Sequence, residues 1–345
     1  MKNYILLIII CCSFVSCNQK TAVTHSVTEE TLNEYDSIYS DKDDPMGTVT
    51  DLNVSDGILI AKHMSDIYAF SFIDTNGKCL LRRWGQIGEA ADELIDFGGA
   101  FEVHDTLLTF DEVIKKNLVR ISLKQLLADE PDIHLQREPY PYTVDFRPMN
   151  FCSIGRYKVF TGYFQDKRLG IVDENGQILG CASDYPIHND GMDDLNKSML
   201  YQSQIKSAPS SDRFVLYTLI SDLFEIYRIS PEGTLERTFL SSASHTPQIY
   251  RRGDRYVIDD SQSEAGFLKM SLTEQHIYFS HSSQKYEKVA KSNWSTQEVL
   301  CYNWDGTLSV VYQIPFPIGA FCVDGQYLYA VRYQGDETIF YRFRL

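Results

Sequence analysis

The stretch Gly170–Leu179, GIVDENGQIL, contains the feature that decides the fold of this chain. Its centre, Asp-x-Asn-Gly, is compatible with two structures. Carboxylate and amide side chains at alternate positions before a glycine begin many calcium-binding loops. Asn and Gly also accept positive φ with little steric cost, so the same residues suit the tight turn of a β-hairpin. Related segments elsewhere in the chain distinguish a metal loop from a turn.

The pattern of an alternating apolar segment, a polar pair ending in Gly, and a second alternating segment recurs along the chain. It is found in FSFIDTNGKCLLRR (Phe70–Arg83), IYRISPEGTLERTF (Ile226–Phe239) and LCYNWDGTLSVVY (Leu300–Tyr312). This pattern is typical of two strands joined by a short turn. Only two of the four copies contain Asp-x-Asn-Gly, and none has the bidentate Glu that a calcium loop needs at its twelfth position. The sequence therefore predicts turns.

A second recurring hairpin lies upstream of each turn. It is clearest in LNVSDGILIAKH (Leu52–His63), FEVHDTLLTFDE (Phe101–Glu112) and FCVDGQYLYAVR (Phe321–Arg332), and looser copies begin at Phe151, Ser207 and Met270. The six units recur at intervals of roughly 50 to 60 residues, close to the length of a propeller blade. We predict an all-β fold, a six-bladed β-propeller with four-stranded blades. The best helical candidate, LKQLLADE after Ser122, is interpreted as a decorated turn of the second unit.

The two ends of the predicted propeller complete one blade together. The sixth unit ends at TIFYRFRL (Thr338–Leu345) and supplies only three strands. We expect its missing outer strand in the segment before the first unit, around Ser37–Val49. Pairing the N-terminal and C-terminal strands in this way removes open sheet edges. The sequence thus predicts a single propeller domain over residues 37–345.

The N-terminus has the features of an export signal. Lys2 is followed by an apolar run, Tyr4–Cys12, which is shorter than the roughly 20 residues that span a membrane. The segment FVSC resembles the lipobox of bacterial lipoproteins, with Cys17 as the lipidated residue. This predicts a signal peptide over residues 1–16 and a lipidated polar tether over residues 17–36. An ordinary secretory signal that is cut elsewhere is the alternative.

Composition excludes some classes of function. The net charge of −15 would repel phosphate backbones, so nucleic acid is not an expected partner. Five cysteines remain beyond Cys17, widely separated and odd in number, which indicates neither a zinc site nor a disulfide framework. The sequence contains no His pair with metal-ligand spacing, no phosphate loop and no G-x-S-x-G. We therefore predict no metal site, no cofactor and no catalytic residue.

The segment RRWGQIGEAADELIDFGG (Arg82–Gly99), the lipobox and the six units together resemble the TolB-like six-bladed β-propeller lipoproteins of Gram-negative anaerobes. The family has a segment of the type G-x-G-P-G-E-F after its first blade. Gly85, Gly88 and Glu93 match it, whereas the Pro is absent. The resemblance implies a lipid-anchored protein of the outer membrane. Because no acidic cluster directly follows Cys17, it favours the periplasmic face over the cell surface.

We expect a ligand or partner to bind the loops between blades, which lie at one end of the channel. The candidates are Arg83, Trp84, Glu93, Arg147, Arg252 and Asp254, whose side chains could grip carboxylates or sugar rings. The sequence favours a non-enzymatic binding propeller for an envelope protein, glycan or peptide. A scaffold subunit of an outer-membrane complex is the first alternative, and a hydrolase or lyase acting on glycans or peptides is the second. A scaffold should expose an apolar patch, and an enzyme should place paired carboxylates or a His–carboxylate pair in the channel.

Overall fold

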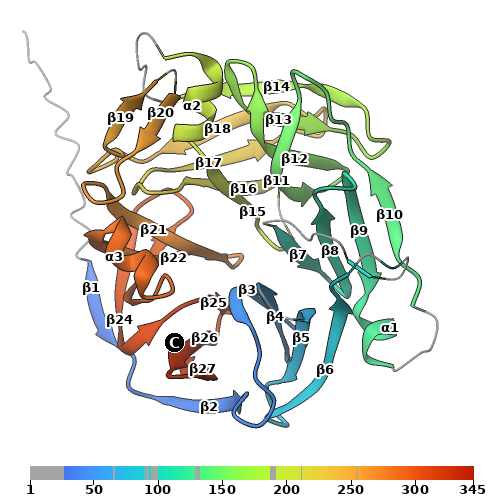
Figure 1. Ribbon diagram of the computed structural model, residues 1–345, viewed down its shortest axis with the longest axis vertical. Coiled ribbons are helices and arrows are strands. Elements are labelled where there is room, and N and C mark those ends of the chain that lie inside the picture. Colours follow the sequence, from blue (N-terminus) through green and yellow to red (C-terminus); the bar gives the residue numbers. More distant parts are fainter. Residues whose placement is uncertain are drawn as a thin grey trace, which may run out of the picture.

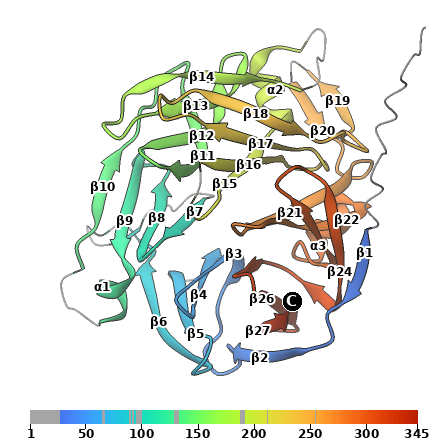
Figure 2. The ribbon, with the colours of Figure 1, turned by 180° about the vertical axis from the view of Figure 1, so that it is seen from behind.

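A ring of antiparallel β-sheets makes up the computed structural model of the protein (Figure 1). The structure describes residues 27–64, 67–88, 90, 93–94, 100–128, 133–186, 192–210, 212–253 and 255–345. Figure 2 shows the same ring from behind. The predicted six-bladed propeller with four-stranded blades is confirmed, because the alternating hydrophobic segments pair in chain order within each blade.

The first three blades follow one another without interruption. Blade 1 contains β3 (Thr48–Ser55), β4 (Ile58–Met64), β5 (Tyr68–Asp74) and β6 (Cys79–Gln86). Blade 2 contains β7 (Phe101–His104), β8 (Leu107–Glu112), β9 (Asn117–Ser122) and β10 (Gln136–Pro139). Blade 3 contains β11 (Arg147–Ile154), β12 (Tyr157–Phe164), β13 (Lys167–Val172) and β14 (Ile178–Asp184).

The last three blades complete the ring. Blade 4 contains β15 (Ser203–Ser207), β16 (Arg213–Thr218), β17 (Phe224–Ile229) and β18 (Leu235–Leu240). Blade 5 contains β21 (Glu264–Leu272), β22 (His276–Lys285), β23 (Thr296–Asn303) and β24 (Leu308–Ile318). Blade 6 contains β25 (Phe321–Val323), β26 (Tyr327–Gln334), β27 (Glu337–Arg344) and β2 (Tyr35–Ser40).

Both families of repeated hairpins occur where the sequence predicts them. The upstream hairpins join the first and second strands of the blades, and we call their turns the inner turns. The GIVDENGQIL family joins third and fourth strands, with Asp173 Oδ1 accepting the backbone N–H groups of Asn175 (2.9 Å) and Gln177 (2.8 Å). Because strands alternate in direction, both sets of turns lie at one end of the channel, the turn face. The loops from blade to blade lie at the opposite end, the loop face.

The ring closes through the two ends of the chain, as predicted. The closing strand is β2, which pairs antiparallel with β27, so it begins at Tyr35 rather than near Ser37 and ends before Val49. Residues 28–31, which we expected in the tether, instead form β1 (Thr28–Thr31) and pair in parallel with β24. The predicted signal peptide and the first half of the predicted tether, including Cys17, lie outside the described residues.

Three short helices and one extra hairpin decorate the ring. Helix α1 (Leu123–Leu127) occupies the third connection of blade 2, as predicted. Helix α2 (Asp194–Leu200) precedes blade 4, and α3 (Tyr286–Lys291) lies within blade 5. The hairpin of β19 (Ile249–Arg252) and β20 (Arg255–Ile258) packs beside α2 (Figure 1). Within the described ranges, no helix is long and apolar enough to cross a membrane.

The hydrophobic core lies between neighbouring blades. Phe70 and Phe72 of blade 1, for example, pack with Phe101 and Phe110 of blade 2. Burial of one such side chain contributes roughly 1.5–3 kcal/mol. Among the five cysteines, Cys152, Cys301 and Cys322 are buried and Cys79 and Cys181 are exposed, so two of them are not core residues. The stacked interfaces fix the inner strands around the channel.

Candidate functional site at the channel mouth

Two adjoining cavities open on the turn face. The first has a volume of about 550 Å³ and is lined by inner strands or inner turns of all six blades. The second, of about 1090 Å³, lies between blades 2, 3 and 4. Glu102, His104, Asp105 and Pro209 line both cavities. The residues of β7 and its turn therefore stand at the junction of the two.

Glu102 and His104 form a pair because alternate residues of a strand lie on the same side. Glu102 Oε2 lies 3.3 Å from His104 Nε2 and accepts the backbone N–H of Ser153 at 2.9 Å. Glu102 Oε1 is buried and has no hydrogen-bond partner among the described residues. Only 13% of the Glu102 side chain is exposed. A buried oxygen without a partner carries an uncompensated desolvation cost, so a donor placed there would be bound favourably.

The surroundings of His104 favour its charged form. The hydrogen bond to Glu102 raises the pKa of His104, and burial opposes this effect. The negative charge of Glu102 and a hydrogen bond to the backbone of Pro209 raise the pKa further. The pair thus presents an imidazole that favours its charged form beside a carboxylate with one unpartnered acceptor oxygen.

The geometry does not provide a serine nucleophile. Ser207 Oγ lies 3.4 Å from Nε2 of His104, the same ring nitrogen that contacts Glu102. A serine–histidine–carboxylate relay requires the hydroxyl and the carboxylate on opposite ring nitrogens. Glu102 and His104 are a His–carboxylate pair of the kind expected above for an enzyme, but without this relay their arrangement is suited to hydrogen bonding with a ligand.

Acidic residues on the inner turns have structural partners. Asp324 Oδ1 accepts the backbone N–H groups of Gln326 (2.9 Å) and Tyr327 (2.8 Å). Glu274 Oε1 accepts both the backbone N–H and the hydroxyl of Ser210 at 2.6 Å, which ties blade 5 to blade 4. These two carboxylates thus shape the turns that surround the cavity.

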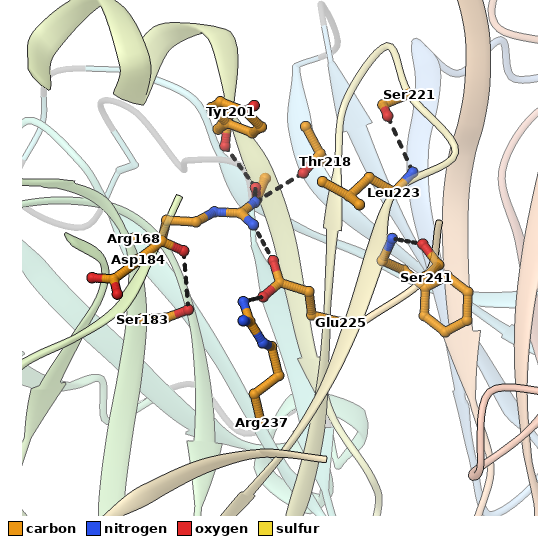
Figure 3. Close-up of polar contacts among 12 residues, drawn as sticks. Arg168, Ser183, Asp184, Tyr201, Thr218, Ser221, Leu223, Glu225, Arg237 and Ser241 are labelled. Carbon is orange, nitrogen blue, oxygen red and sulfur yellow. Dashed lines mark hydrogen bonds and ion pairs between the residues drawn. The ribbon is translucent and has the colours of Figure 1, made fainter. Parts of the chain in front are cut away.

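A second charged cluster lies between blades 3 and 4, nearer the loop face. Figure 3 shows Glu225 between Arg168 and Arg237. Nη2 of Arg168 also donates to the hydroxyls of Ser203 and Thr218, each at 2.8 Å. The second oxygen of Glu225 accepts from Arg237 Nη1 at 2.9 Å and from the Tyr227 hydroxyl.

This cluster is hydrogen-bonded throughout its centre. Both oxygens of Glu225 and both terminal nitrogens of Arg168 have partners in the protein. The two side chains are 1% and 2% exposed. Although Arg168 lines a cavity of about 310 Å³, the role of the cluster is to hold blades 3 and 4 together.

The candidates predicted near the first blade have partners within the fold. Arg83 pairs with Asp44 at 3.0 Å and lies over the ring of Tyr68. Trp84 stacks on Phe70 in the core between blades 1 and 2. Glu93 accepts from the Gln86 side chain and the backbone N–H of Ala90. None of the three predicted residues lines either turn-face cavity.

The remaining candidates lie apart from these. Arg147 begins β11, donates to the carbonyl of Val144 at 3.0 Å and lies over the Tyr163 ring. Arg252 is exposed at the end of β19, and Asp254 lies outside the described residues. The structure therefore does not bring the described candidates together. Sequence reasoning missed Glu102 and His104, although their alternation in FEVH on an inner strand could have indicated them.

Comparison with known proteins agrees with the architecture. The family model "TolB-like 6-blade propeller-like" matches residues 27–326. Comparison with curated proteins finds no significant match. A protein from Bacteroides fragilis NCTC 9343, described as exported, has a similar structure at 11% identity and a TM-score of 0.54, over 92% of this chain and 99% of that one. A DUF4221-family member from Bacteroides vulgatus has 10% identity and a TM-score of 0.52, over 91% and 99%. Because the family model covers most of its length, the chain belongs to the TolB-like six-bladed propeller family.

Proposed function

We propose that this propeller is an exported, non-enzymatic binding protein whose ligand occupies the channel mouth on the turn face. The observation that carries the proposal is the unpartnered oxygen of Glu102 beside His104, at the junction of two open cavities. A pocket with a few convergent polar groups is what small-ligand sites have in common. The volume of about 550 Å³ suits a peptide or glycan fragment.

The location in the cell is part of the same proposal. The apolar N-terminal run and the lipobox-like FVSC support export and a lipid anchor at Cys17. The likeness to a protein described as exported is compatible with this. We place the propeller at the periplasmic face of the outer membrane, where its ligand would be an envelope component.

The ligand can be sought by affinity capture from detergent-solubilised envelope, using the full-length chain and mass spectrometry. Glu102→Gln removes the charge at the site. Glu298→Gln is a matched control, because Glu298 pairs with His281 at 2.6 Å away from both turn-face cavities. Cys17→Ala removes the predicted lipid anchor, so proteins recovered only because they share the membrane should be absent from its capture. We expect one ligand with the wild type and with Glu298→Gln, and its loss with Glu102→Gln. Equal recovery from all variants would contradict the site.

A scaffold role is the second candidate, because exposed apolar side chains gather on the loop face. The exposed set there includes Met64, Ile67, Val113, Ile114, Tyr142, Val144, Met149, Leu195 and Met199. Val113 and Met149 line one cavity with Ser198 of α2, so blades 2 and 3 and this helix share the surface. Ile114→Asp with Val144→Asp should abolish capture of a protein partner if the scaffold role holds. It should leave capture through Glu102 unchanged.

A further inference from the structure

An ion pair crosses the channel beneath the turn-face cavity. Lys206 Nζ of β15 lies 3.1 Å from the carboxylate of Asp51 on β3. These strands belong to blades 4 and 1, which face each other across the ring (Figure 1). Lys206 also lines the cavity of about 550 Å³. The floor of the channel mouth is therefore charged.

A second ammonium group interacts with this ion pair. Lys269, on the inner strand β21 of blade 5, interacts electrostatically with both Asp51 and Lys206. Its side chain is half-buried, and its Nζ has no hydrogen bond or ion pair within the described ranges. Burial lowers the pKa of Lys269, Asp51 raises it and Lys206 lowers it. Two ammonium groups thus share one carboxylate.

Cys322 adds no negative charge to this group. Cys322 of β25 interacts electrostatically with Lys206 and Asp51. Burial raises the pKa of its thiol well above the usual range, so the sulfur stays protonated. Both ammonium groups are partly exposed and have one carboxylate between them, which leaves an excess positive charge that a bound anion would balance.

We propose that Lys269 and Lys206 form an anion subsite that holds a carboxylate or phosphate group of the ligand, with Asp51 orienting Lys206. This subsite rests on the proposed function, since Lys206 lines the same cavity as Glu102. The ligand class follows from the two ends of the site. It is a small molecule or chain end with an anionic group inside and a hydroxyl or ammonium donor at Glu102.

The test uses thermal unfolding of the full-length chain titrated with sodium phosphate or sodium acetate, at ionic strength held constant with sodium chloride. Lys269→Met removes the unpaired charge, and Lys288→Met is the matched control, because Lys288 is exposed on α3 of the same blade. We expect at least one anion to raise the midpoint of unfolding of the wild type and of Lys288→Met. The dissociation constant should rise at least tenfold in Lys269→Met. The anion that is bound identifies the class of ligand group.

Two outcomes would overturn the subsite. In the first, the anion raises the unfolding midpoint of Lys269→Met as much as that of the wild type. In the second, neither anion raises the midpoint of the wild type. Lys206→Met should weaken binding as well, and Lys269→Arg should retain it, so a folding defect in one variant leaves the test intact. Glu102→Gln should still bind the free anion. If the wild type binds neither anion but still captures an envelope ligand that depends on Glu102, the subsite alone is rejected. If the wild type binds an anion but captures no ligand that depends on Glu102, the proposed function is rejected.

Discussion

The Arg168–Glu225 cluster and the Glu102–His104 pair are both charged groups held between neighbouring blades, and a residue of each lines a cavity. They differ in how many of their polar atoms have partners. Both oxygens of Glu225 are hydrogen-bonded, whereas one buried oxygen of Glu102 has no partner among the described residues. The comparison teaches that a fully buried and fully hydrogen-bonded cluster is structural, whereas a partly exposed pair with one unpartnered oxygen is a candidate binding site.

The largest effect is expected at Glu225. Glu225→Gln leaves Arg168 buried beside a neutral group, which should lower the free energy of unfolding by about 3–5 kcal/mol. Denaturant titration of the full-length chain measures this change. The double variant Arg168→Met with Glu225→Leu should lose less than Glu225→Gln, because it leaves no unpaired charge. A loss below about 1 kcal/mol in Glu225→Gln would refute the structural assignment.

A smaller effect is expected at the edge of the same cluster. Because the Arg237 side chain is 35% exposed, water can replace the hydrogen bond that it donates to Glu225. Arg237→Gln should cost roughly 0.5–1 kcal/mol in the same titration. If Arg237→Gln lowers the free energy of unfolding as much as Glu225→Gln does, the exposure of a side chain does not determine its contribution to the cluster.

The Glu102–His104 pair should make the stability of the fold depend on pH. Because the folded-state pKa of His104 is raised, protonation of His104 stabilises the fold below the unfolded-state value of about 6.5. That stabilisation is lost as pH rises through the folded-state pKa. Since 32% of the His104 side chain is exposed, we expect less than about 1 kcal/mol. Unfolding titrations of wild type and His104→Asn should diverge at low pH and converge at high pH; parallel curves would contradict the assignment.

The smallest change in stability is expected at Glu102 itself. Glu102→Gln keeps an oxygen for the backbone N–H of Ser153 and removes a buried charge whose second oxygen has no partner. The free energy of unfolding should therefore stay within about 1 kcal/mol of the wild-type value. If Glu102→Gln lowers the free energy of unfolding as much as Glu225→Gln does, Glu102 has a structural role.

The sequence predicted the fold closely because hairpins are local. The turn residues Asp56, Gly57 and Gly306 adopt the positive φ that a tight turn requires, and the alternation around them sets the register. The closing strand also followed from counting strands. The parallel strand β1 and the hairpin of β19 and β20 were missed, since segments of four residues are too short to carry a clear hydrophobic pattern.

The candidate site was less predictable because its residues are distant in the chain. Lys206 and Asp51 are separated by 155 positions, and only the ring brings them together. Trp84 and Arg83 stood out by residue type, yet their side chains contact neighbouring blades and loops. The unpartnered Oε1 of Glu102 beside His104 can be recognised only in the folded chain.

The central claim is tested most directly by measuring two properties of the same two variants, Glu102→Gln and Glu225→Gln. The free energy of unfolding comes from denaturant titration, and ligand recovery comes from envelope capture normalised to folded protein. We predict that Glu102→Gln keeps its stability and loses the ligand. Glu225→Gln should lose stability while its folded fraction keeps the ligand. Loss of the ligand in both variants, or in neither, would contradict the distinction between the two regions.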